Sequence, residues 1–248
     1  MVSYQRYADV YDRSGQIAFS LKMIPYLQEL QQRHVPPGRV VLDLACGTGT
    51  VALGFAQQGW EAYAIDGSPA MLAQATSKAL ESGVRPVFSQ QDMRCFVLPR
   101  AVSLVTCLYD SLNYMLSLAD LRQVMQRVAA ALQPGGLFMG DMNTREMLEH
   151  VWGDNTFFVE GESLTIVMQS RYVHETRLST LRVVGFVRQS DGRYERFEEL
   201  HTETSFEQAQ IRAVMESAGL HVEASYECFG FEPAAEGTHR IMWVARRL

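Results

Sequence analysis

The sequence predicts an α/β fold, in which a doubly wound and mostly parallel sheet of seven strands carries an added antiparallel region in the C-terminal half of the chain. Two observations lead to this prediction. Between residues 37 and 150, short apolar runs alternate with segments that repeat apolar residues at helical spacing. Beyond residue 150, the segments are rich in β-branched and aromatic residues and are joined by turn sequences.

The first helix is expected at residues 16–34. Pro25 lies inside it, and because proline has no N–H to donate, Pro25 is expected to kink this helix or to divide it in two. The apolar side chains that recur at helical spacing and define the helix are Ile17, Leu21, Ile24, Leu27 and Leu30.

The alternating elements that follow define the parallel sheet. The strand at 39–45 is almost entirely apolar, as a strand buried on both faces requires. Ser68 before Pro69, and Ser117 before Asp120, are typical of helix N-termini. The other strands of this part are predicted to end at 64–66 and to span 86–90, 101–108 and 137–141, and the helices are predicted at 50–58, 68–82 and after Ser117.

The C-terminal half is expected to add antiparallel strands and then to complete the sheet. A hairpin turn is predicted at Asp191-Gly192. A helix is expected to begin at Ser205, with Gln208 completing a capping box and Gly219 ending the helix. The strands of this half are predicted at 156–160, 164–174, 178–189 and 193–204, followed by 221–230 and 239–246.

The composition argues against several classes of protein. The 28 acidic residues outnumber the 22 basic ones, and this charge balance argues against nucleic-acid binding, which relies on a basic surface. No apolar run reaches the roughly 18 residues that span a membrane. The N-terminus lacks the pattern of a secretory signal, so a cytoplasmic location is expected. The cysteines are scattered and show no metal-ligand spacing, so no metal site is predicted.

Groups suited to a ligand follow three consecutive predicted strands. A turn with Gly47 and Gly49 follows the first strand, Asp66 ends the second, and Asp92 with Met93 follows the third. The carboxyl ends of parallel strands meet at one edge of the sheet, so these groups are expected to converge there. The turn does not match the dinucleotide fingerprint Gly-x-Gly-x-x-Gly, which argues against a pyrophosphate-binding loop.

The carboxylates of this edge suit an adenosine. Asp66 is placed to accept hydrogen bonds from both ribose hydroxyls, although it could instead cap the helix that begins at Ser68. Asp92 is suited to accept from the adenine amine, while the N–H of Met93 meets a ring nitrogen. The three strand ends together favour a binding site over coincidence.

These motifs resemble those of the class I S-adenosylmethionine-dependent methyltransferases, which have a Rossmann-like fold. Ala45 departs from the pattern, because many relatives have glycine there, but a methyl group is expected to be compatible with the turn. The resemblance rests on Leu42 to Thr50, Asp66 to Leu72, Gln91 to Arg94, Tyr109 to Tyr114 and Leu132 to Gly136. The chain further resembles a bacterial subgroup of small-molecule type that is related to the sugar N,N-dimethyltransferases. This resemblance rests on Tyr7 to Asp12, Asp110 to Tyr114 and Glu199 to His201.

The resemblance implies S-adenosylmethionine as cofactor and S-adenosylhomocysteine as product. It implies that Met71 packs on the adenine, that Leu108 and Tyr109 lie beneath the cofactor, and that Tyr11 closes over the methionyl end. Tyr11 could instead be a surface aromatic that packs on a helix. The full set of residues implied in cofactor binding is Tyr11, Gly47, Thr48, Gly49, Asp66, Gly67, Met71, Asp92, Met93, Leu108 and Tyr109.

The residues that bind the methyl acceptor are harder to predict from sequence. A sulfonium methyl is already activated, so a general base is needed only for a protonated nucleophile. His201, flanked by Glu199 and Glu203, and Tyr114 are the candidates for such a base. His201 could instead belong to a structural polar network. Arg240 is either an anion-binding residue or a salt-bridged surface arginine. The candidates for acceptor contacts are Tyr7, Asn113, Tyr114, Arg171, His201 and Arg240.

The predicted function is methyl transfer to an unidentified small molecule. The alternatives are a nucleotide-binding oxidoreductase, which the glycine spacing opposes, a non-catalytic S-adenosylmethionine-binding module, and an RNA or protein methyltransferase. The whole chain, 1–248, is expected to form one methyltransferase domain, in which the antiparallel region either covers the cofactor edge or builds a homodimer interface. Its parts are an N-terminal helical segment (1–36), a cofactor-binding core (37–150), an antiparallel β insertion (151–204) and a final helix with two strands (205–248).

Overall fold

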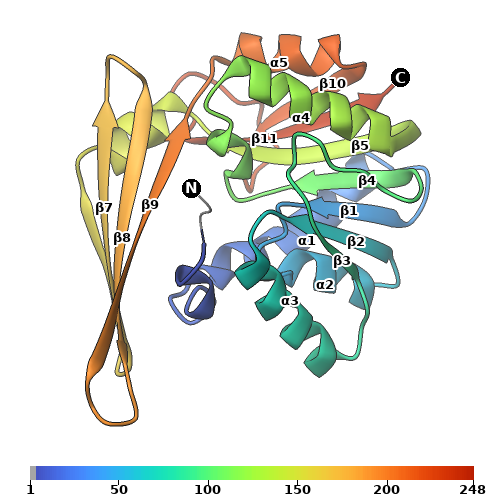
Figure 1. The fold of residues 1–248 in the computed structure, drawn as a ribbon. Coiled ribbons are helices and arrows are strands. Elements are labelled where there is room, and N and C mark those ends of the chain that lie inside the picture. Colours follow the sequence, from blue (N-terminus) through green and yellow to red (C-terminus); the bar gives the residue numbers. More distant parts are fainter. Residues whose placement is uncertain (1–3) are drawn as a thin grey trace.

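The computed structural model describes residues 4–248, whose strands form two separate β-sheets (Figure 1). The strands of the larger sheet are β1 (Val40–Leu44), β2 (Glu61–Asp66), β3 (Val87–Gln90), β4 (Val102–Cys107), β5 (Leu132–Asn143), β10 (Leu220–Glu227) and β11 (Arg240–Arg247). The strands of the smaller sheet are β6 (Thr156–Glu160), β7 (Leu164–Val173), β8 (Leu178–Arg188) and β9 (Tyr194–Thr204).

The larger sheet is mostly parallel, with the order β10-β11-β5-β4-β1-β2-β3. Only β11 is antiparallel to its neighbours, β10 and β5. The smaller sheet has the order β6-β7-β8-β9 and is antiparallel throughout. These observations confirm the predicted fold class. The order of the larger sheet reverses between β1 and β4, where doubly wound folds bind ligands beyond the carboxyl ends of the strands.

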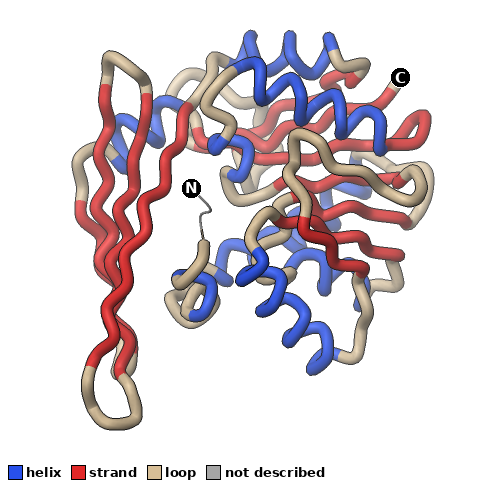
Figure 2. The backbone as a smooth tube through the Cα atoms, viewed as in Figure 1, coloured by secondary structure: helices blue, strands red, loops and turns tan. Residues whose placement is uncertain are grey.

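Helices separate most of the strands up to β5, whereas β6 to β9 follow one another with no helix between them (Figure 2). Ser68 and Ser117 cap two of the helices as expected, since their side chains accept the N–H groups of Met71 and Asp120. The α-helices are α1 (Ile17–Arg33), α2 (Thr50–Gln57), α3 (Pro69–Ser82), α4 (Leu118–Ala131) and α5 (Gln208–Ser217), and the short helices are η1 (Tyr7–Asp9), η2 (Ser111–Tyr114) and the π-helical η3 (Met147–Trp152). No helix within residues 4–248 has both the length and the apolar character needed to cross a membrane.

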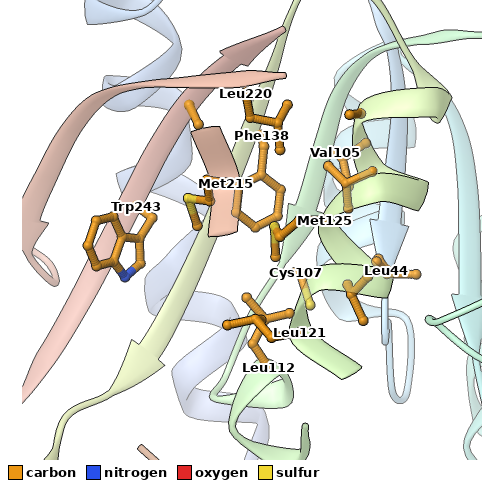
Figure 3. Packing of buried hydrophobic residues seen from close by; sticks show 14 of the residues in the cluster. Leu44, Val105, Cys107, Leu112, Leu121, Met125, Phe138, Met215, Leu220 and Trp243 are labelled. Atoms are coloured by element: carbon orange, nitrogen blue, oxygen red, sulfur yellow. The ribbon is translucent and has the colours of Figure 1, made fainter. Parts of the chain in front are cut away.

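Helices cover both faces of the larger sheet. On one face, side chains of α4 and α5 such as Leu121, Met125 and Met215 pack with the buried strand residues Leu44 and Trp243 (Figure 3). On the other face, α1 and α2 pack against the alternate residues of the same strands, including Val41, Leu104 and Met139. Because successive strand residues point to opposite faces, burial on both sides explains the nearly continuous apolar runs.

The smaller sheet stands beside the larger one, and the N-terminal segment, here residues 4–16, lies between them (Figure 1). The side chains of Tyr7 and Val10 pack against Ile166, Val183 and Phe197 of the smaller sheet. This packing leaves the N-terminal segment next to the carboxyl ends of the parallel strands, where the ligand groups were predicted.

The structure departs from the local predictions at two helices. Of the two outcomes predicted for Pro25, division of the helix does not occur, because α1 is continuous through this residue. The carbonyl that Pro25 leaves unpaired belongs to Leu21, which is 54% exposed, so water is able to satisfy it. Helix α5 is capped by Glu207 and Gln210 instead of Ser205 and Gln208, because β9 keeps the chain extended as far as Thr204.

Candidate functional site

The loop after β1 is shaped by backbone conformations that favour glycine. Gly47 and Gly49 have φ values of 54° and 75°, and Ala45 has a φ of 58° although it carries a Cβ. A Cβ added to Gly49 would lie 2.8 Å from the Cβ of Ala75, whereas one added to Gly47 would meet nothing within 4 Å. Gly49 is therefore needed for packing, and Gly47 leaves its backbone open to a ligand.

Asp66 joins this loop to the end of β2. One carboxylate oxygen accepts the N–H of Gly47 at 2.8 Å, and the other accepts the N–H of Ser68 at 2.7 Å. Burial raises the pKa of Asp66, and these N–H groups oppose the rise. The helix cap is supplied by the side chain of Ser68, so Asp66 fixes the loop geometry and does not take the capping position.

Asp92 follows β3 and forms an ion pair with Arg94. The Arg94 Nη2 lies 2.6 Å from Asp92 Oδ2, and the backbone N–H of Arg94 also donates to this carboxylate. The hydrogen bonds from Arg94 lower the pKa of Asp92. Asp92 is therefore a carboxylate at the same sheet edge as Asp66, as the topology predicted.

A cavity of about 450 Å³, here called the loop cavity, opens at this edge. It contains most of the predicted cofactor residues, but Gly49 does not line it. Its lining includes Tyr4, Tyr11, Asp43, Ala45, Cys46, Gly47, Thr48, Asp66, Gly67, Met71, Asp92, Met93, Leu108, Tyr109, Ser111 and Tyr114. A neighbouring cavity of about 420 Å³ shares Asp66, Gly67, Asp92 and Met93 with it and extends along Gln90 and Gln91.

A smaller cavity of about 210 Å³, here called the tyrosine cavity, lies between the larger sheet and the smaller one. Tyr4, Tyr11, Tyr109 and Tyr114 line both this cavity and the loop cavity, so the two cavities adjoin at these side chains. The remaining lining residues are Tyr7, Gln16, Asp110, Trp152, Phe157, Met168, Leu181, Val183, His201 and Glu203.

A chain of hydrogen bonds runs along the wall of the tyrosine cavity. The hydroxyls of Tyr4 and Tyr114 are 2.8 Å apart, and the Tyr114 hydroxyl lies 3.0 Å from Nδ1 of His201. His201 is buried, which lowers its pKa, and its Nε2 has no hydrogen-bond partner within the described residues. The nearest carboxylate, Glu199, is 3.6 Å from this nitrogen. His201 is therefore only partly satisfied.

Arg240 takes a different position from either of its predicted ones. Its side chain is 11% exposed, so it is not a surface arginine. One Nη donates to Asp110 at 2.7 Å and the other forms an ion pair with Asp141. Because both ends of the guanidinium are occupied by carboxylates, Arg240 is also poorly suited to bind an anionic acceptor.

Asp141 in turn holds the backbone that follows β4. Its carboxylate accepts the N–H groups of Tyr109 and Asp110, at 2.7 and 3.1 Å. Both residues have positive φ values, 54° and 53°, which are unfavourable for residues with a Cβ. Asp141 thus stabilises the strained turn that directs Tyr109 to the cavities.

Three predicted acceptor residues, Asn113, Arg171 and Arg240, line neither cavity. Arg171 is exposed on β7. Asn113 is fully buried, and its amide nitrogen donates to the backbone carbonyls of Asn143 and Thr204. Sequence reasoning also gave no role to Asp110 and named Glu203 only as a neighbour of His201. The sequence could not predict that Asp110 and Glu203 lie together, because the packing of the two sheets, and no sequence motif, brings them together.

Comparison with known proteins agrees with this geometry. The family described as "Methyltransferase domain" matches residues 41–136. The crystal structure of an S-adenosylmethionine-dependent methyltransferase from Clostridium acetobutylicum ATCC 824 is similar with a TM-score of 0.87, 26% identity and coverage of 98% of each chain. The chain is a class I S-adenosylmethionine-dependent methyltransferase.

Two relatives of this methyltransferase match it in sequence. A protein of Geobacillus sp. (strain WCH70), provisionally named a methyltransferase, is 28% identical over 247 residues, which are 99% of this chain and 100% of the relative. The dTDP-3-amino-3,4,6-trideoxy-alpha-D-glucopyranose N,N-dimethyltransferase of Streptomyces venezuelae is 27% identical over 205 residues, 79% of this chain and 81% of the relative. The predicted relationship to sugar N,N-dimethyltransferases is therefore confirmed.

The loop cavity of the methyltransferase fits its cofactor, S-adenosylmethionine. A volume of about 450 Å³ is within the range of small-molecule sites. The backbone at Gly47 and Gly67 is open, because a Cβ added at either position would meet no atom within 4 Å. Asp66 supplies a half-buried carboxylate suited to ribose hydroxyls, and Met71 supplies a buried apolar surface. The individual contacts stay predictions.

Proposed function

We propose that the methyltransferase transfers a methyl group to the amine nitrogen of a small molecule bound in the tyrosine cavity. The observation that carries this proposal is the composition of that cavity. It adjoins the loop cavity and combines aromatic walls with the carboxyl groups of Asp110 and Glu203. Aromatic faces and carboxylates both attract a cationic nitrogen.

The relationship to the Streptomyces venezuelae protein supports a nitrogen acceptor. That relative is named as an N,N-dimethyltransferase of an amino sugar linked to a nucleotide. The tyrosine cavity, at about 210 Å³, supports an acceptor group of small size.

The residues of the chain have to align the acceptor and exclude water. Bound S-adenosylmethionine supplies a methyl group that its sulfonium already activates. Tyr4 and Tyr11, which are held between the two sheets, line both cavities and are suited to orient an acceptor at their junction. The hydrogen bond between Ser68 Oγ and the carbonyl of Tyr4 ties this wall to the start of α3.

The experiment that tests the proposal compares amines with matched alcohols. The protein is incubated with S-adenosylmethionine and with glucosamine or glucose, or with benzylamine or benzyl alcohol, and S-adenosylhomocysteine formation is measured together with the mass of the product. We expect turnover of amines and none of alcohols. Methylation of the alcohols at comparable rates, or cofactor binding with no turnover of any amine, would contradict the proposal.

An Asp66→Ala variant serves as the control for the cofactor site. Removing a charged acceptor is expected to weaken binding of S-adenosylmethionine and S-adenosylhomocysteine by about 1.5–3 kcal/mol, measured by calorimetry. An unchanged affinity would show that Asp66 does not hold the ribose.

A further inference from the structure

The tyrosine cavity rests on a cluster of buried charges that is not balanced. Three carboxyl groups, those of Asp110, Asp141 and Glu203, are less than 9% exposed. The cation that contacts this cluster is Arg240, and it is shared between Asp110 and Asp141. Within the described residues, Glu203 therefore has no cation of its own. A buried carboxylate without a counter-charge is unfavourable.

Among residues 4–248, Glu203 also lacks a strong hydrogen-bond partner. Its side chain is 3% exposed and lines the tyrosine cavity. The one hydrogen bond recorded for its carboxyl group comes from Asn143 Nδ2 at 3.5 Å, the limit for such a bond, and the same amide donates to Asp110 at 2.9 Å. A nearly unpartnered carboxyl group in a buried cavity points to a ligand that supplies the missing donor and charge.

We propose that Glu203 binds the ammonium form of the acceptor and accepts its proton, so that the nitrogen becomes able to take the methyl group. This inference rests on the proposed function, since it requires an amine acceptor. It assigns the base to Glu203 and not to His201, whose Nδ1 is already bonded to Tyr114 and whose Nε2 is buried.

The proton transfer balances as follows. One N–H bond of the ammonium breaks, its electron pair stays on nitrogen, and an O–H bond forms on Glu203. The nitrogen lone pair then bonds to the methyl carbon as the bond between that carbon and sulfur breaks, which leaves a neutral thioether. The methylated nitrogen carries the positive charge away, and Glu203 gives its proton to water after the product leaves.

The surroundings of Glu203 suit this role. Burial, followed by the nearby Asp110, raises the pKa of Glu203 well above its usual range, so this carboxyl group holds a proton more strongly than an exposed one does, and an entering cation favours release of that proton. A base with a raised pKa is better matched to an amine than an ordinary carboxylate. The titratable and charged groups that face it are Tyr4 of the N-terminal segment, Asp110 and Tyr114 near η2, Asp141 of β5, His201 of β9 and Arg240 of β11.

The test uses choline, which is permanently cationic and has no N–H proton. Its binding to the protein loaded with S-adenosylhomocysteine is measured by calorimetry between pH 5 and 8, in pairs of buffers with different ionisation enthalpies, so that proton release is counted. The neutral compound 3,3-dimethyl-1-butanol, which has the same shape, is the matched ligand. We expect wild type to bind choline at least about tenfold more tightly than the alcohol and to release protons on binding choline.

Glu203→Gln is expected to lose both the preference for choline and the proton release, while still binding S-adenosylhomocysteine. Glu203→Asp is the second variant and is expected to retain part of both. Glu198→Gln is the matched control, because Glu198 is on the same strand but is exposed and paired with Arg182. It is expected to behave as wild type.

Three outcomes would overturn the assignment: no binding of choline, binding without proton release, or equal choline binding by wild type and Glu203→Gln. These failures are separate from a failure of the proposed function, which would appear as absent amine turnover in the wild-type assay. A protein that methylates amines but releases no proton on binding choline retains its function and loses only the role of Glu203.

Discussion

Ala45 carries the clearest backbone strain in the loop after β1. A residue with a Cβ in the left-handed region costs about 1–2 kcal/mol, and the φ of Ala45 is 58°. Ala45→Gly should remove this cost, although glycine adds freedom to the unfolded chain worth about 0.4–1 kcal/mol. We therefore expect the free energy of unfolding, measured in urea, to rise by about 0.5–1 kcal/mol.

The control for this prediction is Ala129→Gly in α4, where the backbone is helical. That change should lower stability by about 1 kcal/mol. If both glycine variants were destabilised alike, the positive φ of Ala45 would not reduce the stability of the folded protein.

Gly47 and Gly49 should respond differently to alanine, although both have positive φ values. Gly49→Ala places a Cβ 2.8 Å from Ala75 and 3.3 Å from the ring of Phe88, so it should cost about 1–3 kcal/mol more stability than Gly47→Ala. Gly47→Ala, at the wall of the loop cavity, should mainly weaken S-adenosylhomocysteine binding. Urea unfolding and calorimetry on both variants measure the two effects; a reversed order in stability would contradict the packing argument.

At the scale of elements, one side chain of β9, that of Glu199, binds the backbone of the N-terminal segment. The carboxylate of Glu199 accepts the N–H groups of Tyr4, Arg6 and Tyr7, at 2.8, 2.7 and 2.9 Å. Glu199→Ala should cost about 1.5–3 kcal/mol locally, because a charged acceptor of three bonds is lost. Hydrogen exchange of these three amides should accelerate by at least about tenfold.

Glu195→Ala provides the comparison. Glu195 is on the same strand and forms an exposed ion pair with Arg6. Exposed pairs contribute about 1 kcal/mol or less, so this variant should leave exchange of the three amides nearly unchanged. Equal acceleration in both variants would mean that a general loosening of β9, and not the carboxylate of Glu199, controls the N-terminal segment.

The elements of the larger sheet could be predicted because their signals are local. The apolar runs predicted the strands that are buried on both faces. Ser68 and Ser117 predicted the starts of two helices, and both are N-caps in the structure. The start of α5 could not be predicted, because the pairing of β9 with β8 keeps the chain extended up to Thr204, directly before Ser205.

The site could be predicted only where it follows from the sheet. The strand ends brought Gly47, Asp66 and Asp92 to one cavity, as parallel topology requires. The surroundings of Glu203 depend instead on how the smaller sheet packs on the larger one, and no periodicity in the sequence carries that information. The ion pairing of Arg240 was predicted as one alternative, but its burial was not, because its two carboxylate partners, one directly before η2 and one on β5, are far away in sequence.

For the molecule as a whole, the division into segments 1–36, 37–150, 151–204 and 205–248 stays a prediction, as do the cytoplasmic location and the homodimer. The smaller sheet has a role that does not depend on them, because its side chains form one wall of the tyrosine cavity.

The stability of the whole fold should depend on pH through Asp43. Burial raises the pKa of this carboxyl group to about 7, whereas an unfolded aspartate titrates near 3.9. The folded protein thus binds the proton more strongly, so this contribution to stability is complete below about pH 4 and is lost as the pH rises toward 7. The loss should be at most about 4 kcal/mol.

Asp43→Asn isolates this contribution, because the amide does not titrate. Urea unfolding of both proteins from pH 4 to 8 should give a wild-type stability that falls relative to the variant as the pH rises. Parallel curves would show that Asp43 titrates alike in the folded and unfolded chains.

The position of β11 has a consequence for how this protein is made. Arg240, at the start of β11, pairs with Asp110 and Asp141, which are 130 and 99 positions earlier. Until the ribosome has released β11, strand β5 is an unpaired edge of the sheet. Asp110 and Asp141, which are buried in the folded protein, also lack the positive charge of Arg240 until then. The ion pairs of Arg240 with Asp110 and Asp141 can therefore form only after nearly the whole sequence has been translated. A nascent chain arrested before residue 240 should not retain S-adenosylhomocysteine.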